Sequence, residues 1–448
     1  MNSPSNRGPR TLKIVFLTLF LDLVGFSIIF PLFPDLLDYY LPENPQGEST
    51  PLLAHLIKPL YQLAELSNHT DPKFITTVLF GGILGSLYSL LQFICAPIWG
   101  SLSDIHGRKN ILLVTISGLA ISYAIWAFAG NFWILIIARI GGGIMGGNIS
   151  VATAIVADVT PPEKRTSGMA IVGIAFGLGF ILGPAIGGFL GQFNLLEYHP
   201  ALKEFGINPF TITAVFSLLL SIINLVWVYS SLPESLPDEL RKRSSAEPFK
   251  MFSLFQHENK KIQKINLCYF IYMTAFSGME FTLTFLAVDR FLFSTVENGL
   301  MFVYIGFFLI LTQGLLVRKF SPVFGEQNLS ISGLLAGIFA FILLSQSTGL
   351  SLFFIALAMM ALSIGLTSPS MSALVSLNAS ESEQGTLLGL FRSAGSFART
   401  IGPLFAAFIY FAMGPTASYA LGSVLVLIAL MAFYSLPWKR QNFAEVTN

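Results

Sequence analysis

Twelve long apolar segments, separated by polar stretches, constrain this chain more than any other feature of its sequence. A membrane-spanning helix needs about 20 mainly apolar residues, and the segments are close to or above that length. Only 11% of the 448 residues are charged, against about 25% in soluble domains. We therefore expect an all-α polytopic membrane protein. The predicted spans are residues 12–33, 74–102, 111–129, 132–156, 167–190, 209–232, 265–291, 299–320, 329–345, 350–377, 384–413 and 416–436.

Lysine and arginine residues predict the orientation of these spans, because cytoplasmic loops carry an excess of positive charge. If both termini are cytoplasmic, 18 of the 25 Lys and Arg residues fall in cytoplasmic segments and four in outer loops. The other three, Arg139, Arg392 and Arg399, lie within spans. We therefore expect both termini in the cytoplasm, in a bacterial inner membrane or a eukaryotic plasma or organelle membrane.

A charged stretch over residues 233–264 divides the spans six and six. It predicts a cytoplasmic linker between an N-terminal six-helix bundle (1–232) and a C-terminal one (265–448). A long outer loop over residues 35–73 belongs to the first bundle and contains a glycosylation sequon at Asn68.

The two halves are weakly alike. Gly183-Pro184 in the fifth span and Gly402-Pro403 in the eleventh lie at the same depth. Because each half contains an even number of spans, both halves enter the membrane from the same side. Parallel repeats of this kind are associated with two bundles that rock about a binding site near the bilayer midplane.

Several other classes of protein are disfavoured by what the sequence lacks. It contains no Gly-Lys dipeptide, and hence no G-x-x-x-x-G-K-[ST] phosphate loop of an ATP-driven pump. It contains neither a G-x-S-x-G elbow nor Cys/His metal spacing, so we expect no enzyme, metal or cofactor. The net charge of +1 gives no field that would attract nucleic acid. Cys95 and Cys268 lie in apolar runs and are expected to be packing thiols.

Five ionisable residues lie well inside the predicted spans: Asp22, Arg139, Glu280, Arg392 and Arg399. An ionisable side chain at mid-bilayer costs at least about 2.5–3.5 kcal/mol on insertion scales, so such residues are candidates for function. The alternative is that they form static ion pairs that hold helices together. Burial favours the neutral form of a carboxyl group, whereas a nearby guanidinium favours the carboxylate. A buried acid can therefore bind or release a proton when its surroundings change.

The predicted cavity is expected to bind organic molecules. The chain has 42 Phe residues, and the segment "FSGMEFTLTFL" places aromatic side chains and Met279 beside Glu280. Apolar walls with few polar groups are typical of small-molecule sites. Three arginines against two acids leave an excess positive charge, which favours organic anions or zwitterions. The expected cavity residues are Asp22, Arg139, Met279, Glu280, Arg392 and Arg399.

Several motifs resemble those of the major facilitator superfamily. "GSLSDIHGRK" resembles the signature of the loop between spans two and three, and "RIGGGIMGG" resembles the span-four signature. "GFILGPAIGG" is similar to the span-five signature of the drug:proton antiporter branch. "LDLVGFSIIFPLFP" and "GTLLGLFRSAGSFARTIGP" resemble the tetracycline-resistance and tetracycline-transporter-like subgroup. Spans three, eight and nine lack the acids and the His of tetracycline exporters, which argues against tetracycline as the substrate.

The resemblance implies twelve transmembrane helices in two pseudo-symmetric six-helix bundles. It also implies a monomeric, proton-coupled antiporter that exports drug-like or other amphiphilic organic molecules by alternating access. A proton symporter or facilitator of an organic metabolite in the same fold is the alternative. Spans one and four adjoin in this fold, so Asp22, as proton carrier, is expected to face Arg139. Glu280 and Arg399 are expected to form a matching pair in the second half.

The resemblance further implies a conformational latch on the cytoplasmic side. Within the loop signature, Gly100 and Gly107 flank Asp104, which is expected to lie at the start of span eleven, near Gly385. A helix N-terminus there would favour the anion. Arg108 is expected to pair with Asp158 at the end of span four. Both contacts are expected only while the cytoplasmic side is closed.

The antiporter signature is rich in glycine. Small residues spaced four apart allow two helices to approach closely, and a proline inside a helix removes a backbone donor and bends it. From the residues alone, helix packing is the expected role, and antiport follows only from the resemblance. The signature residues are Gly179, Gly183, Pro184, Gly187 and Gly188.

Overall fold

The structure is a computed structural model that describes residues 7–40, 72–161, 165–236, 259–378 and 384–436. These residues are almost entirely helical and include no strand. Ten of the described helices are long and apolar enough to cross a membrane. Most of the predicted outer loop, including Asn68, and most of the predicted linker lie outside the described residues.

The first half of the chain supplies the first group of helices. These are α1 (Arg7–Ser27), α2 (Phe33–Tyr40), α4 (Pro72–His106), α5 (Arg108–Ala127), α6 (Phe132–Met145), α7 (Asn148–Val159), α8 (Arg165–Leu190), α9 (Leu195–Tyr198) and α10 (Thr211–Ser231), with the 3₁₀ turns η2 (Phe30–Leu32) and η4 (Pro200–Phe205).

The second half supplies α12 (Lys260–Phe291), α13 (Thr295–Leu311), the π-helical segment η6 (Thr312–Val317), α14 (Arg318–Gln346), α15 (Leu350–Leu377) and α16 (Gln384–Tyr434). α16 covers the eleventh and twelfth predicted spans. It is kinked at Gly414, whose φ of 84° and ψ of 169° suit a residue without a Cβ.

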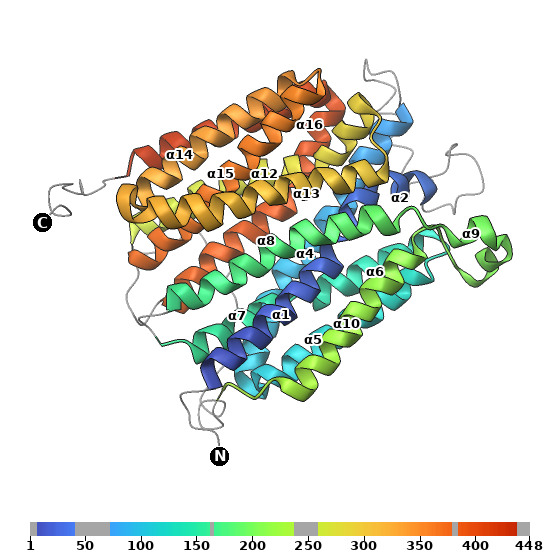
Figure 1. Cartoon of the computed structure of the whole chain (residues 1–448), viewed down its shortest axis with the longest axis horizontal. Coiled ribbons are helices and arrows are strands. Elements are labelled where there is room, and N and C mark those ends of the chain that lie inside the picture. Colours follow the sequence, from blue (N-terminus) through green and yellow to red (C-terminus); the bar gives the residue numbers. More distant parts are fainter. Residues whose placement is uncertain (1–6, 41–71, 162–164, 237–258, 379–383, 437–448) are drawn as a thin grey trace, which may run out of the picture.

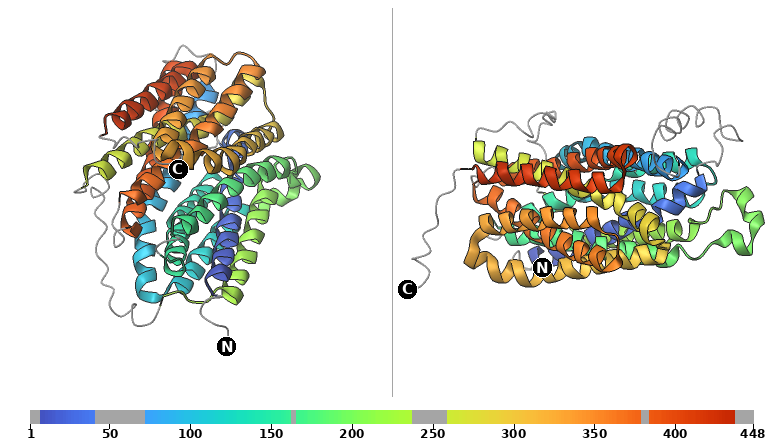
Figure 2. Two further views of the ribbon diagram at one scale, coloured as in Figure 1. Left: turned by 60° about the vertical axis from the view of Figure 1, so that its left-hand side comes forward. Right: turned by 90° about the horizontal axis from the view of Figure 1, so that it is seen from above.

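The two halves lie side by side as two groups of helices, coloured blue to green and yellow to red (Figure 1, Figure 2). They meet along two seams, where α8 packs against α13 and α4 packs against α16. We call the end of the bundle where α1 begins and α16 ends the terminal side, and the opposite end, which carries α2, the distal side. Helix α12 begins on the terminal side, where Lys264 donates a hydrogen bond to Ser435, just after α16.

Many large apolar side chains on the outside of the bundle are exposed. Examples are Ile121, Val226 and Met431, each at least 60% exposed. Such a surface suits lipid, because within a bilayer the backbone polar groups are satisfied inside the helices and only side chains meet the hydrocarbon. The structure therefore supports an integral, multi-pass membrane protein.

Candidate functional site

A cavity of about 1560 Å³ lies between the two halves. Its walls are mostly apolar and come from α1, α4, α5, α7 and α8 on one side and from α12, α13, α15 and α16 on the other. Gly100, Arg108 and Asp158, near the terminal-side ends of their helices, also line it. The cavity therefore reaches the terminal side of the bundle.

The halves are joined on the distal side. Thr295 at the start of α13 donates a hydrogen bond to Asp35 of α2. The rings of Phe33 and Phe281 meet at a centroid distance of 5.7 Å. A Cβ on Gly188 of α8 would lie 2.9 Å from the Cα of Gly299, so these helices touch backbone to backbone. The structure thus represents a state closed on the distal side.

Asp22 lines the cavity and is held by two amides. Asn224 Nδ2 of α10 lies 2.9 Å from Asp22 Oδ1, and Asn148 of α7 donates to Asp22 Oδ2. Asn224 Nδ2 also donates to the carbonyl of Thr18, 3.1 Å away. The carboxyl group therefore has neutral hydrogen-bond donors on both oxygens.

A break in the fourth span brings Asn148 to this position. The sequence predicts one helix over 132–156, but α6 ends at Met145 and α7 begins at Asn148. Trp99 Nε1 donates to the carbonyl of Ile144 at 2.7 Å, and Gln92 Nε2 donates to that of Gly146 at 3.0 Å. These bonds from α4 satisfy backbone groups freed by the break, as a membrane interior requires.

Arg139 occupies a different place from the one predicted. Its guanidinium carbon lies 4.6 Å from the ring centroid of Tyr88, a cation–π distance, and the Tyr88 ring packs on Phe26. Arg139 forms no ion pair with Asp22 in this conformation, and it is not among the described residues that line the cavity. In this state Tyr88 contacts the guanidinium and lines the cavity itself, and the roles predicted for Arg139 in the cavity and beside Asp22 stay predictions.

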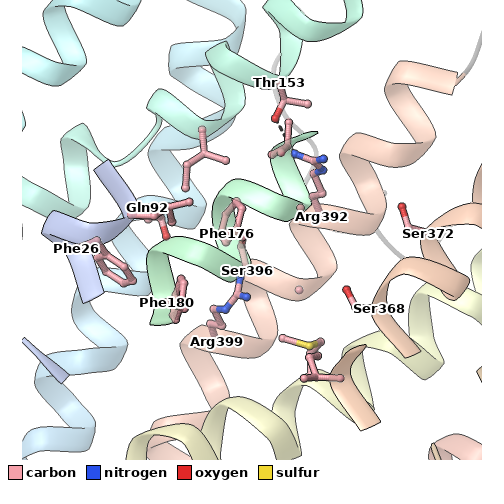
Figure 3. Close-up of a pocket in the computed structure, with 18 of the residues that line it drawn as sticks. Phe26, Gln92, Thr153, Phe176, Phe180, Ser368, Ser372, Arg392, Ser396 and Arg399 are labelled. Carbon is pink, nitrogen blue, oxygen red and sulfur yellow. Dashed lines mark hydrogen bonds between the residues drawn. The ribbon is translucent and has the colours of Figure 1, made fainter. Parts of the chain in front are cut away.

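The four other predicted ionisable residues share the cavity. Arg392 Nη1 of α16 donates to Thr153 Oγ1 of α7 at 2.6 Å, which joins the two halves across the cavity (Figure 3). Arg399, two turns further along α16, has a buried Nε without a partner among the described residues. Glu280 and Met279 line the same cavity. Within the described part, no hydrogen bond or ion pair joins Glu280 to Arg399, so the predicted pair is not formed in this state.

The loop signature is partly described. Arg108 Nε lies 3.1 Å from Asp158 Oδ2, the pairing expected from the resemblance. Both residues belong to the first half and are paired in this state, and a dependence of this pair on closure of the cytoplasmic side stays a prediction. Nothing is described of the side chain of Asp104 or of the surroundings of Gly385, and their contact stays a prediction.

Glu234, just after α10, is a partner of this loop that sequence reasoning missed. Its carboxylate oxygens accept hydrogen bonds from the backbone nitrogens of Arg108 and Lys109, at 3.0 and 3.1 Å. An anion here is favoured by the unpaired N–H groups at the start of α5. Gly107, directly before α5, has a φ of 92° and a ψ of 146°, which favour glycine.

The glycines of the antiporter signature pack α8 against its neighbours. A Cβ on Gly179 would lie 2.5 Å from Leu23 Cβ, one on Gly183 would overlap Ser27 of α1, and one on Gly187 would overlap Ile28, directly after α1. Ser27 Oγ of α1 donates to the Gly179 carbonyl at 3.0 Å. Pro184 lies inside α8, and Gly188 faces α13 instead of α1. These contacts support helix packing as the role of the signature glycines.

Comparisons with known proteins agree with this architecture. Residues 15–347 match the family model of the Major Facilitator Superfamily. Major facilitator superfamily domain-containing protein 10 of Mus musculus is 33% identical, over 98% of this chain and 94% of the relative. The class C tetracycline resistance protein of Escherichia coli is 28% identical, over 97% and 99%.

A solved structure is similar over nearly the whole chain. The crystal structure of the human organic anion transporter MFSD10 (TETRAN) aligns with a TM-score of 0.78 and 32% identity, covering 95% of this chain and 99% of that one. The fold, the cavity between two bundles and the family match lead to one conclusion. The chain belongs to the Major Facilitator Superfamily of membrane transporters.

Proposed function

We propose that this protein is a proton-coupled antiporter that exports amphiphilic organic anions by alternating access. One observation carries the proposal: Asp22, a carboxyl group held by two neutral amides, lines the same cavity as the two arginines Arg392 and Arg399. A group that can take up a proton and groups that can bind an anion thus share one space.

Asp22 is the proposed proton carrier. Its partners Asn148 and Asn224 belong to the same half of the chain, so all three move together when the halves rock. What changes between states is access of water and of a bound anion to the cavity. A carboxylate is favoured when the cavity is open to water, and the neutral acid is favoured when the site is dry. An anion that holds the cavity open and hydrated therefore promotes release of the proton.

The C-terminal half supplies the proposed anion subsite. Arg399 has a buried nitrogen without a described partner, and guanidinium groups bind carboxylate and similar anions through paired N–H donors. Phe176 and Phe180 of α8 project toward the same space as Arg399 (Figure 3) and would contact an apolar or aromatic part of the substrate. The human relative is an organic anion transporter, which supports an anionic substrate.

The terminal side is the proposed cytoplasmic side. The excess of lysine and arginine in the segments assigned to this side supports the orientation. The structure would then be an inward-facing state, in which cytoplasmic substrate can reach Arg392 and Arg399. We also propose that the protein works as a monomer, because one chain supplies both walls of the cavity.

Proton release on ligand binding tests the proposal. Purified protein in weakly buffered detergent would receive matched amphiphilic anions, zwitterions and cations between pH 5 and 8. We expect anions to release protons from the wild type but not from Asp22→Asn. Release that persists in Asp22→Asn and disappears in Glu280→Gln would move the proton site to the second half. Anion binding without release at any pH would favour a facilitator, and proton uptake would favour a symporter.

A further inference from the structure

The seam between α8 and α13 is tight at one end and open at the other. On the distal side, a Cβ on Gly306 of α13 would overlap Ile181 of α8. Toward the terminal side, a Cβ on Gly177 would meet Leu309 only at 3.9 Å, and one on Gly173 or Gly314 would meet nothing within 4 Å. The two helices lie close together at their right-hand ends in Figure 1 and separate toward the left. The seam therefore widens toward the terminal side.

The open end of this seam borders the cavity. Gly173 and Ile174 of α8 line the cavity, yet both are exposed, Ile174 to 51%. Val317 of η6 lines the cavity from the other side, and its neighbour Leu315 is 61% exposed. Exposed apolar residues at the cavity wall on both sides of the seam suit a lateral opening between the two helices.

The chain is irregular and polar at this opening. After Leu311 the α-helix changes to the π-helical segment η6, and such segments often occur at functional sites. Gln313 in this segment lines the cavity and has no hydrogen bond to a described residue. A polar side chain within a membrane is costly unless it faces a partner or a water-filled cavity, and such residues often mark substrate pathways.

The second seam between the halves differs. Where α4 meets α16, the rings of Phe93 and Phe397 are 5.3 Å apart. Phe397 also stacks on Phe270 of α12 at 5.4 Å. Large aromatic side chains thus fill this seam, whereas glycines flank the other one.

We propose that the opening between α8 and η6 is a lateral portal for the tail of a single-chain amphiphilic anion. The tail enters from the cytoplasmic leaflet, while the anionic head group stays in the cavity and reaches Arg392 and Arg399. A Cβ on Gly173 or Gly314 would meet nothing within 4 Å, so the seam leaves room here for one extended chain. The portal rests on the proposed function and specifies its substrate: an anion with one long aliphatic tail, taken from the membrane.

Two probes that differ only in chain length test the portal. N-palmitoyl taurine partitions into the bilayer and N-hexanoyl taurine stays mostly in water, and both carry a permanent sulfonate. Their transport would be followed as radiolabel in proteoliposomes with an imposed pH gradient. The portal variant is Gly314→Trp. Matched controls are Gly314→Ala and Leu300→Trp, since Leu300 is 60% exposed near the distal end of α13.

We expect Gly314→Trp to lower transport of the palmitoyl probe at least tenfold and to leave the hexanoyl probe within twofold. Both controls should transport both probes within twofold of the wild type. Equal loss of the two probes in Gly314→Trp, or unchanged palmitoyl transport, would overturn the portal while leaving the proposed function intact. Failure of the wild type to carry either probe would instead overturn the proposed function and the portal together.

Discussion

Replacing Asn224 by leucine should shift the pH dependence of transport in a defined direction. Asn224 Nδ2 donates to Asp22 Oδ1 at 2.9 Å. A hydrogen bond to a charged group contributes about 1.5–3 kcal/mol, and one pH unit corresponds to about 1.4 kcal/mol. Loss of the donor weakens the carboxylate form, so Asp22 would bind its proton at higher pH. The pH of half-maximal proton-driven transport should therefore rise by about one to two units.

The same substitution should change folding little. In the described structure Asn224 Oδ1 is buried without a hydrogen-bond partner, a cost of about 1–3 kcal/mol that leucine removes. The substitution also removes the two hydrogen bonds that Asn224 Nδ2 donates, to Asp22 and to the Thr18 carbonyl, which lowers stability. These effects are of similar size and opposite sign. A shift of the pH profile without a large fall in thermal stability is the expected signature of a positioning residue.

Anion transport into proteoliposomes from pH 5 to 9, together with the melting temperature in detergent, would measure both quantities. Ser221→Ala is the matched control, because Ser221 is buried on the same helix and donates to the Ile116 carbonyl, away from Asp22. It should keep the wild-type midpoint. A lower rate for Asn224→Leu at an unchanged midpoint would refute the reasoning, since Asn224 would then not tune the proton carrier.

Three further substitutions have expected outcomes. Thr153→Val removes the hydrogen-bond partner of Arg392, so the apparent KM for anions should fall severalfold in transport assays, and Thr153→Ser should restore it. Gly107→Ala places a Cβ at a φ of 92° and should destabilise the fold by about 1–3 kcal/mol, seen as a lower melting temperature. Asp158→Asn weakens the pair with Arg108; turnover should slow at an unchanged KM, and a raised KM would contradict a role confined to the conformational change.

Much of the helical architecture could be predicted from hydropathy. The tenth span was expected over 350–377, and α15 covers Leu350–Leu377. Length and apolarity suffice there because every spanning helix must satisfy its backbone internally. The break between α6 and α7 could not be foreseen in this way. It depends on donors from another helix, Gln92 and Trp99, which hydropathy does not detect.

The candidate site was predictable where charge marks it. Asp22, Glu280, Arg392 and Arg399 stand out in apolar runs, and the structure places all four around one cavity. The contacts of Asp22 and Arg139 were not predictable. Asp22 is held by two amides. Arg139 contacts an aromatic ring, Tyr88, which no count of opposite charges reveals.

Two neutral amides and one loop residue were missed for related reasons. Asn148 and Asn224 lie in apolar spans, and an asparagine there is a weaker signal than an ionisable residue. Glu234 lies in a polar stretch that contains several charged residues, so one more acid gives no specific signal. In the structure it caps the start of α5. A search for amides within predicted spans would have found the first two.

Uphill transport in proteoliposomes tests the central claim most directly. With a pH gradient imposed and the organic anion at equal concentration on both sides, we expect the wild type to build a concentration gradient of the anion. Asp22→Asn should build none, yet it should still exchange labelled for unlabelled anion at equilibrium, which shows that the cavity and its motion are intact. Accumulation by Asp22→Asn to the wild-type level would contradict Asp22 as the proton carrier.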